Sequence, residues 1–145
     1  EKNKYNYVLN LFTSFGYFKN KKNNKLVVNG ISNALKKNGI FVIDFLNTDY
    51  CLNNLVEKET KIIQKKKFNI KRWHNKKYLF KKIEFQDKKE KKSYTERIQL
   101  LKKTEIVNIC KKEKLKLIKS FGDYQLNKFD EKSERLILFF KKTIN

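Results

Sequence analysis

The sequence predicts an α/β fold in which two parallel strands and a closing antiparallel hairpin share one sheet, with an inserted antiparallel β meander. Three observations predict this fold. Residues 5–46 alternate strand, helix and strand, residues 60–101 contain extended stretches only, and the last two strand candidates are joined by a connection too short for a crossover helix. We therefore expect one mixed sheet whose chain is interrupted by an insertion.

The first part of the chain has the pattern of a βαβ unit. Tyr5–Phe12 (YNYVLNLF) and Ile40–Leu46 (IFVIDFL) are apolar enough to be strands buried on both faces. Between them, apolar residues at helical spacing predict a helix from about Asn24 to Lys37, which Asn38-Gly39 would end. A helix of this length can cross over between parallel strands, so we expect the two strands to lie side by side.

The middle of the chain has a different pattern. Tyr50–Val56 is a short helix candidate, and three extended stretches follow it: KFNIKRW, YLFKKIEF and SYTERIQL. Their alternation predicts an antiparallel meander, and a change of phase within YLFKKIEF predicts a β-bulge. A helix over Lys103–Glu113 and two strands, KLKLIKSF and RLILFFKK, complete the chain. The predicted parts are residues 1–49, 50–101 and 102–145.

The large positive charge has two explanations. The net charge is +21, yet only three of the 36 basic residues are arginine, whose planar fork suits phosphate. Residues with A/T-rich codons (Lys, Asn, Ile, Phe and Tyr) are abundant, whereas proline is absent and alanine occurs only at Ala34. We therefore favour nucleotide bias as the cause. A basic, non-enzymatic α/β module that binds RNA is the alternative.

Composition excludes several classes of protein. A hydrophobic fraction of 39% with 14% aromatic residues indicates a folded domain. No apolar run approaches the roughly 20 residues of a membrane helix, so no membrane association is expected. Cys51 and Cys110 lie far apart and outside a CxxC spacing, which predicts reduced thiols in a cytoplasmic protein and no metal site. The chain begins at Glu1 and has no methionine, so we expect a piece of a longer protein.

The stretch LFTSFGYF, residues 11–18, is unusual for the end of a strand. It mixes turn residues with aromatic rings, namely Thr13, Ser14 and Gly16 with Phe15, Tyr17 and Phe18. Ligands of open α/β sheets bind beyond the carboxyl ends of parallel strands, so this loop is a candidate binding site. Each ring could equally belong to the hydrophobic core, and the hydroxyls could serve only the turn.

Three segments, YNYVLNLFTSFGYF, LKKNGIFVIDFLN and FGDYQLNKFDEKSERLILFFKK, resemble class I S-adenosylmethionine-dependent methyltransferases. The resemblance covers nearly the whole chain and implies the second, carboxyl-terminal half of a Rossmann-like sheet. Tyr5–Phe12 corresponds to the family's fourth strand, Ile40–Leu46 to its fifth, and the closing pair to its sixth and seventh. The family's glycine-rich turn and the acidic residue ending its second strand have no counterpart here. The resemblance thus implies a fragment, inactive alone, whose partner is the amino-terminal half of the same enzyme.

The resemblance also implies S-adenosylmethionine as cofactor and a small molecule as methyl acceptor. In the family, the end of the fourth strand faces the methionine part of the cofactor, which places Asn10, Phe12 and Thr13 there. The residues implied to bind the acceptor are Ser14, Phe15, Gly16, Tyr17 and Asn47. Asn47 could equally cap the next segment, and Asp44 could also touch the acceptor. No side chain is expected to act as a strong acid or base, because methyl transfer from a sulfonium needs mainly alignment and an enclosed site.

Overall fold

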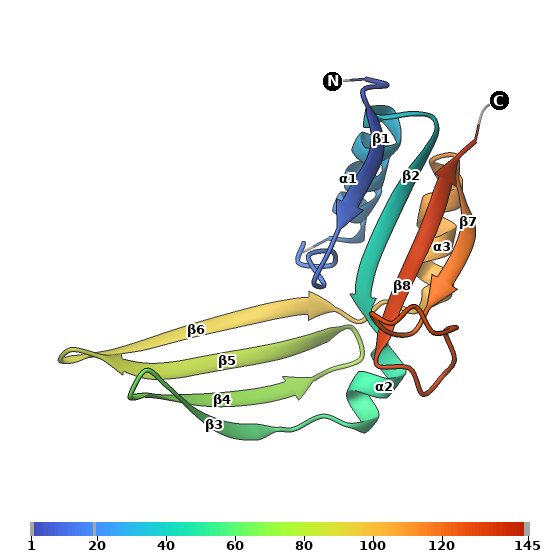
Figure 1. Ribbon diagram of the computed structural model, residues 1–145. Helices are drawn as coiled ribbons and strands as arrows, with labels where there is room; N and C mark the ends of the chain where they lie inside the picture. The colour runs from blue at the N-terminus through green and yellow to red at the C-terminus, as the bar shows by residue number, and fades with distance from the viewer. Residues whose placement is uncertain (1, 19, 144–145) are drawn as a thin grey trace. The chain divides into compact units, whose positions relative to one another are not determined.

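The computed structural model describes residues 2–18 and 20–143, and the chain divides into two compact units (Figure 1). Unit 1 contains the residues up to Leu52 and those from Leu101 onward, and unit 2 is Asn53–Leu100. Each unit has its own four-stranded sheet. The predicted mixed α/β architecture is therefore present, with two sheets.

Unit 1 is built on a mixed sheet with the order β1-β2-β8-β7. Strand β1 pairs in parallel with β2, and β8 pairs antiparallel with both β2 and β7, as the sequence predicts. The elements of this unit are β1 (Tyr5–Asn10), α1 (Lys21–Ala34), β2 (Leu35–Leu46), α2 (Thr48–Asn53), α3 (Lys103–Lys112), β7 (Leu115–Phe121) and β8 (Arg135–Lys142), with the last residue of α2 belonging to unit 2.

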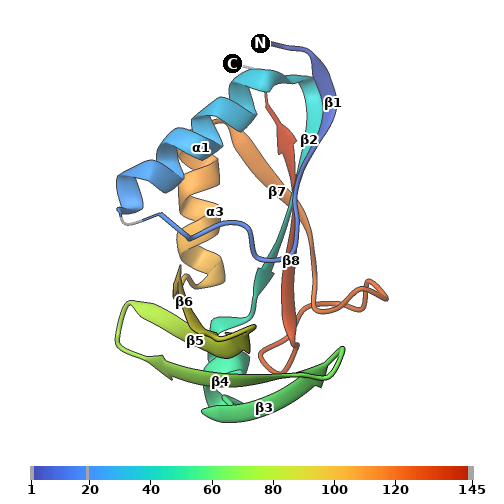
Figure 2. The same cartoon turned by 90° about the vertical axis from the view of Figure 1, so that its left-hand side faces the viewer.

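The core of unit 1 lies between this sheet and two helices. Helices α1 and α3 cover the same face of the sheet (Figure 2). On that face the cross-strand partners Phe41 and Phe140 are fully buried, and their rings stack with centroids 5.9 Å apart. Ile43 and its partner Leu138 are buried in the same row. Each such side chain stabilises the fold by about 1.5–3 kcal/mol through burial of apolar surface.

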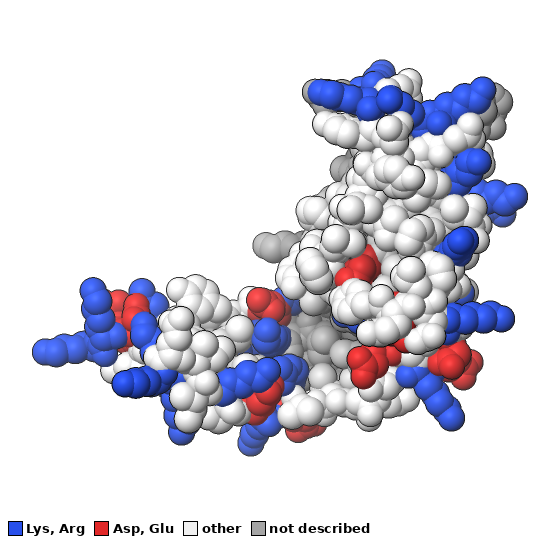
Figure 3. Space-filling view, viewed as in Figure 1, with Lys and Arg blue, Asp and Glu red and all other residues white. Residues whose placement is uncertain are grey.

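Among the described residues, the face away from the helices is open along β1, at the edge of this sheet. Tyr7 pairs with Ile40 and Leu9 with Val42, so these side chains share the face away from the helices. Tyr7 is 68% exposed and Leu9 is 58% exposed. Over β1 and β2 the surface of unit 1 is largely uncharged, whereas Lys and Arg gather at the end where β1 begins (Figure 3). Strand β1 therefore presents apolar side chains on an unpaired edge.

The boundary between α1 and β2 differs from the expected one. The helix ends at Ala34, and β2 already begins at Leu35, which pairs with Tyr5. Asn38 and Gly39, expected to end the helix, lie inside β2, where Asn38 has a φ of 61°. A Cβ on Gly39 would lie 2.9 Å from the carbonyl oxygen of Lys36 and 3.2 Å from that of Asn6, so the close approach of the backbone explains this glycine. The pairing of β1 and β2 overrides the local helix-end signal.

Unit 2 is an antiparallel sheet of four consecutive strands, β3-β4-β5-β6. Its strands are β3 (Lys58–Ile63), β4 (Lys66–His74), β5 (Tyr78–Asp87) and β6 (Glu90–Gln99). Three of them match the expected stretches, whereas β3 was not expected. The predicted bulge is also wrong, because β5 pairs with β4 and β6 in unbroken register. The change of phase instead gives both faces of the sheet aromatic rings, Trp73 stacked on Phe80 and Phe85 on Tyr94.

Candidate functional site

The candidate site lies in unit 1, at the carboxyl ends of β1 and β2. Because these strands are parallel, the loop after β1 and the last residues of β2 meet at the same edge of the sheet. The loop 11–18 follows β1 there, and Asp44 is near the end of β2. Strand β8 begins at this edge with Arg135, the partner of Leu46.

Asp44 organises this edge. Its side chain is 2% exposed, and four donors surround its carboxylate. Oδ1 accepts hydrogen bonds from Arg135 Nε (2.9 Å) and Arg135 Nη2 (2.6 Å). Oδ2 accepts from the backbone N–H of Phe12 (2.9 Å) and from the hydroxyl of Tyr124 (3.0 Å). One buried carboxylate thus joins β2 to β8 and to two separate loops.

The backbone of Phe12 and Thr13 has an uncommon conformation. Their φ angles are 55° and 57°, in the left-handed region that residues with a Cβ rarely adopt. The N–H of Thr13 donates to the carbonyl oxygen of Asp44 (3.0 Å), and Arg135 Nη2 donates to Thr13 Oγ1 (2.9 Å). Strained residues of this kind cost about 1–3 kcal/mol each and concentrate at functional sites. Here the hydrogen bonds that Asp44 accepts from the two backbone N–H groups, and the one that Arg135 donates to Thr13, offset the strain.

The three residues implied to bind the cofactor adjoin one another at this edge. Phe12 is 76% exposed, so its ring projects from the turn that Asp44 holds. Thr13 is buried, with its Oγ1 bonded to Arg135. Asn10 ends β1, and its Oδ1 is buried without a hydrogen-bond partner. A buried acceptor of this kind suits a ligand that brings its own donor, such as an ammonium group.

Of the residues implied to bind the acceptor, only some are accessible in unit 1. Phe15 is 1% exposed and is part of the core, whereas Tyr17 is 44% exposed. The hydroxyl of Ser14 donates to the carbonyl oxygen of Leu11, which tightens the turn. Gly16 has a φ of 86°, a conformation that favours glycine. Phe15 and Gly16 therefore shape the loop, and Tyr17 is the more exposed of the two rings.

Asn47 has a well-defined structural task. Its Nδ2 donates to the carbonyl oxygens of Ser133 (2.7 Å) and Glu131 (3.2 Å), so it holds the loop that precedes β8. Its own carbonyl accepts from the N–H of Cys51 in the first turn after β2. Asn47 is only 6% exposed, so its side chain is engaged mainly in these hydrogen bonds. Its contact with an acceptor stays a prediction.

Two residues of this edge were not singled out from the sequence. Arg135 could have been noticed as a rare arginine in a lysine-rich chain, at the start of the last strand. Tyr124 lies in the loop after β7 and carries no local signal. Burial and the hydrogen bond to Asp44 raise the pKa of Tyr124, so its hydroxyl remains a donor at neutral pH. The guanidinium of Arg135 lies 5.8 Å from the Tyr124 ring centroid.

Among the described residues, nothing supports a metal site, a reactive thiol at Cys110 or a membrane-spanning helix. No group of three or more His, Cys, Asp or Glu side chains there could hold a metal ion. Burial raises the pKa of Cys110 to about 12, so this thiol is not a nucleophile. No helix in the described part of the chain is long and apolar enough to cross a membrane.

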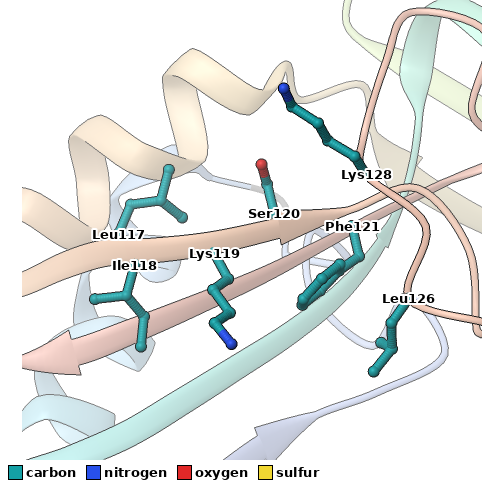
Figure 4. Close-up of a pocket in the computed structure, with 7 residues that line it drawn as sticks. All are labelled: Leu117, Ile118, Lys119, Ser120, Phe121, Leu126 and Lys128. Carbon is teal, nitrogen blue, oxygen red and sulfur yellow. The ribbon is translucent and has the colours of Figure 1, made fainter.

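The hollow along β7 is separate from the predicted site residues. It encloses about 400 Å³ and is lined by residues of β7 and of the loop that follows it. Figure 4 shows Phe121 and Leu126 on one side of the strand, with Ser120 and Lys128 pointing to the other. None of the residues expected to bind cofactor or acceptor lines it, so it takes no part in the candidate site.

Replacement of Phe15 and of Tyr17 by alanine should have different consequences. Phe15→Ala is expected to lower the free energy of unfolding by about 3–5 kcal/mol, because it opens a cavity in the core. Tyr17→Ala should change it by about 0.5 kcal/mol or less, as at most exposed positions. Urea unfolding of both variants measures the difference. Equal stability losses would contradict the burial that separates these rings.

Comparison with known proteins supplies the fold relationship. No protein-family model matches the sequence, and a search of curated proteins finds no match. Among solved structures, an S-adenosylmethionine-dependent methyltransferase from Clostridium acetobutylicum superposes with a TM-score of 0.84 over 98% of this chain, at 17% identity. The CcbJ methyltransferase from Streptomyces caelestis gives 0.82 over 97% of the chain, at 13% identity. The sugar N-methyltransferase KedS8 from a Streptoalloteichus species gives 0.73 over 98%, at 9% identity.

The match covers only part of each of these enzymes. This chain spans 60% of the Clostridium structure, 62% of CcbJ and 57% of KedS8. At such low identity the likeness concerns the fold. The chain therefore has part of the fold of S-adenosylmethionine-dependent methyltransferases.

Proposed function

We propose that this chain is the carboxyl-terminal part of an S-adenosylmethionine-dependent methyltransferase that acts on a small molecule. The observation that carries the proposal is the TM-score of 0.84 with a methyltransferase over 98% of the chain. The edge at which β1 and β2 end supports it further, because a strained, exposed turn lies at the position where open α/β sheets bind ligands. In a living cell we expect the protein in the cytoplasm.

The residues at the carboxyl end of β1 suit the cofactor that we propose. When bound, S-adenosylmethionine supplies a sulfonium-activated methyl group, which an acceptor lone pair takes in line as the carbon–sulfur bond breaks. Asn10 Oδ1, buried and without a partner, can accept a hydrogen bond from the cofactor's ammonium group. The Phe12 ring, 76% exposed, offers an aromatic face to a cationic methyl group. Thr13 holds the turn through Arg135.

The acceptor is proposed to be a small molecule rather than RNA. Two of the similar structures are described as acting on sugars, the amino pentose methyltransferase CalS10 and the sugar N-methyltransferase KedS8. Tyr17 is exposed next to the turn and would line the acceptor side, with Ser14, Phe15, Gly16 and Asn47 shaping it. The role of these residues is to orient the acceptor and to exclude water, because the displacement itself needs no strong base.

The proposed enzyme needs a segment that supplies the glycine-rich cofactor loop. The four glycines of this chain are Gly16, Gly30, Gly39 and Gly122, and no two have the GxG spacing. Strand β1 supports the same idea. It is the one edge strand of the described residues that carries no charged side chain, whereas β3, β6 and β7 all carry lysines. We propose that the amino-terminal half of the enzyme pairs with β1.

The test is methyl transfer by the protein expressed together with any polypeptide encoded in frame before Glu1. With S-adenosylmethionine labelled in its methyl group, we expect label in small amines or amino sugars and equal release of S-adenosylhomocysteine. A matched reaction without acceptor gives the background. If no label leaves the cofactor and the protein instead binds RNA with an affinity that falls steeply as salt rises, the alternative of a basic RNA-binding module is correct.

A further inference from the structure

Two loops that are far apart in the sequence form hydrogen bonds with the same oxygen atom of Asp44. Asp44 Oδ2 accepts from the backbone N–H of Phe12 in the loop after β1 and from the hydroxyl of Tyr124 in the loop after β7. Phe12 is 76% exposed and Tyr124 is 58% exposed, so both rings project toward solvent from a common buried anchor. One carboxylate is therefore hydrogen-bonded to both loops.

The other oxygen of this carboxylate is held in place. Arg135 donates to Asp44 Oδ1 from Nε and from Nη2, which prevents the carboxylate from rotating. The same Nη2 also donates to Thr13 Oγ1. The pair thus bonds the backbone of Phe12, the side chain of Thr13 and the side chain of Tyr124 in one network. All of its members lie in unit 1.

We propose that Asp44, oriented by Arg135, is a positioning residue that sets the loops after β1 and β7 together, so that Phe12 on the cofactor side and Tyr124 on the acceptor side form two walls of the site where the methyl group is transferred. This proposal rests on the proposed function for the identity of the ligand. The coupling between the loops does not, because it follows from the hydrogen bonds alone. Tyr124 thereby becomes a candidate specificity residue in a loop to which the resemblance assigned no ligand contact.

A carboxylate is required by the identity of its partners. All four hydrogen bonds at Asp44 come from donors: two guanidinium N–H groups, one amide N–H and one hydroxyl. An asparagine at this position would turn its NH₂ group toward either Arg135 or the two loops, and in both orientations a donor would face donors. Asp44→Asn, which replaces one oxygen by an NH₂ group, therefore tests the hydrogen-bonding role while the size of the side chain stays the same.

The experiment follows both loops in ¹⁵N-labelled protein by amide exchange and NMR. In Asp44→Asn, hydrogen exchange at the Phe12 amide should accelerate about tenfold or more, because a hydrogen bond to a charged group is lost. The ring resonances of Tyr124 should shift in the same variant. Arg135→Lys keeps the charge without the fork and should produce both changes to a smaller extent. It serves as the second variant if Asp44→Asn does not fold.

Matched variants show whether the effect is specific. Tyr124→Phe removes one donor from Oδ2 and should leave the Phe12 amide protected, since Asp44 still binds it. Glu59→Gln removes the charge of the partly buried pair with Arg72 in unit 2 (2.8 Å) and should change neither Phe12 nor Tyr124. If Asp44→Asn alters only one loop, or accelerates exchange equally throughout unit 1, the positioning role is refuted.

Turnover separates this inference from the proposed function. In the methyltransferase assay, Asp44→Asn should lower kcat/KM for the acceptor and should also weaken binding of S-adenosylmethionine, because Phe12 on the cofactor side is held by the same carboxylate. Tyr124→Phe should alter KM for the acceptor and leave binding of S-adenosylmethionine unchanged. If the unsubstituted protein, expressed together with the segment encoded in frame before Glu1, transfers no methyl group, the proposed function fails, and the NMR result still decides whether the loops are coupled. If it does transfer methyl groups and Asp44→Asn retains full kcat/KM, the positioning role fails.

Discussion

S-Adenosylmethionine should not bind measurably to residues 1–145 alone. The chain has no GxG turn to bring the backbone against the cofactor. The family that it resembles also uses a carboxylate at the end of its second strand, and that region has no counterpart in this chain. The contacts that we propose, at Asn10, Phe12 and Thr13, concern only the methionine part of the cofactor. Isothermal titration calorimetry of the isolated chain should therefore give no saturable heat.

The control for this titration is the longer polypeptide that includes any segment encoded in frame before Glu1. We expect this longer polypeptide to bind the cofactor one-to-one with micromolar or tighter affinity. A micromolar dissociation constant corresponds to about 8 kcal/mol of binding free energy. The same affinity for the isolated chain would mean that residues 1–145 contain a complete cofactor site, and the proposal of a carboxyl-terminal part would be wrong.

The isolated chain should self-associate through β1, and two lysines should suppress that association. Strand β1 has unpaired backbone groups at the sheet edge, no charged side chain, and exposed Tyr7 and Leu9. An uncharged apolar edge is a template for another strand. The double variant Tyr7→Lys, Leu9→Lys is expected to be monomeric under conditions in which the unsubstituted chain forms oligomers, as measured by sedimentation velocity.

A matched variant distinguishes this edge from general hydrophobicity. Ile62→Lys changes an equally exposed residue, 75% accessible, in the edge strand β3, which already carries Lys58 and Lys61. It should leave the oligomeric state almost unchanged. If Ile62→Lys also gives monomers, or if the β1 variant still forms oligomers, association proceeds through a surface other than β1. The β1 variant should also lose methyl transfer in the longer protein, because the same edge is proposed to pair with the amino-terminal half.

The sequence alone determined the order and type of most elements. Hydrophobic periodicity is a local signal, and it was sufficient for the first two strands, for the helix between them and for the closing hairpin. The parallel pairing of β1 and β2 followed from the length of the connection. The candidate edge followed from the rule that ligands bind beyond the carboxyl ends of such strands. Whether Asn10, Phe12 and Thr13 contact a cofactor remains a prediction.

The tertiary structure decided what depends on contacts between distant segments. It ended α1 at Ala34, because Leu35 pairs with Tyr5. It buried Phe15 and exposed Phe12, a distinction that neighbouring aromatic residues in a sequence cannot reveal. It also brought Arg135 and Tyr124 to Asp44 across about ninety and eighty positions of the chain. Such hydrogen bonds have no period and no spacing, so they become visible only when folding brings β8 and the loop after β7 to the end of β2.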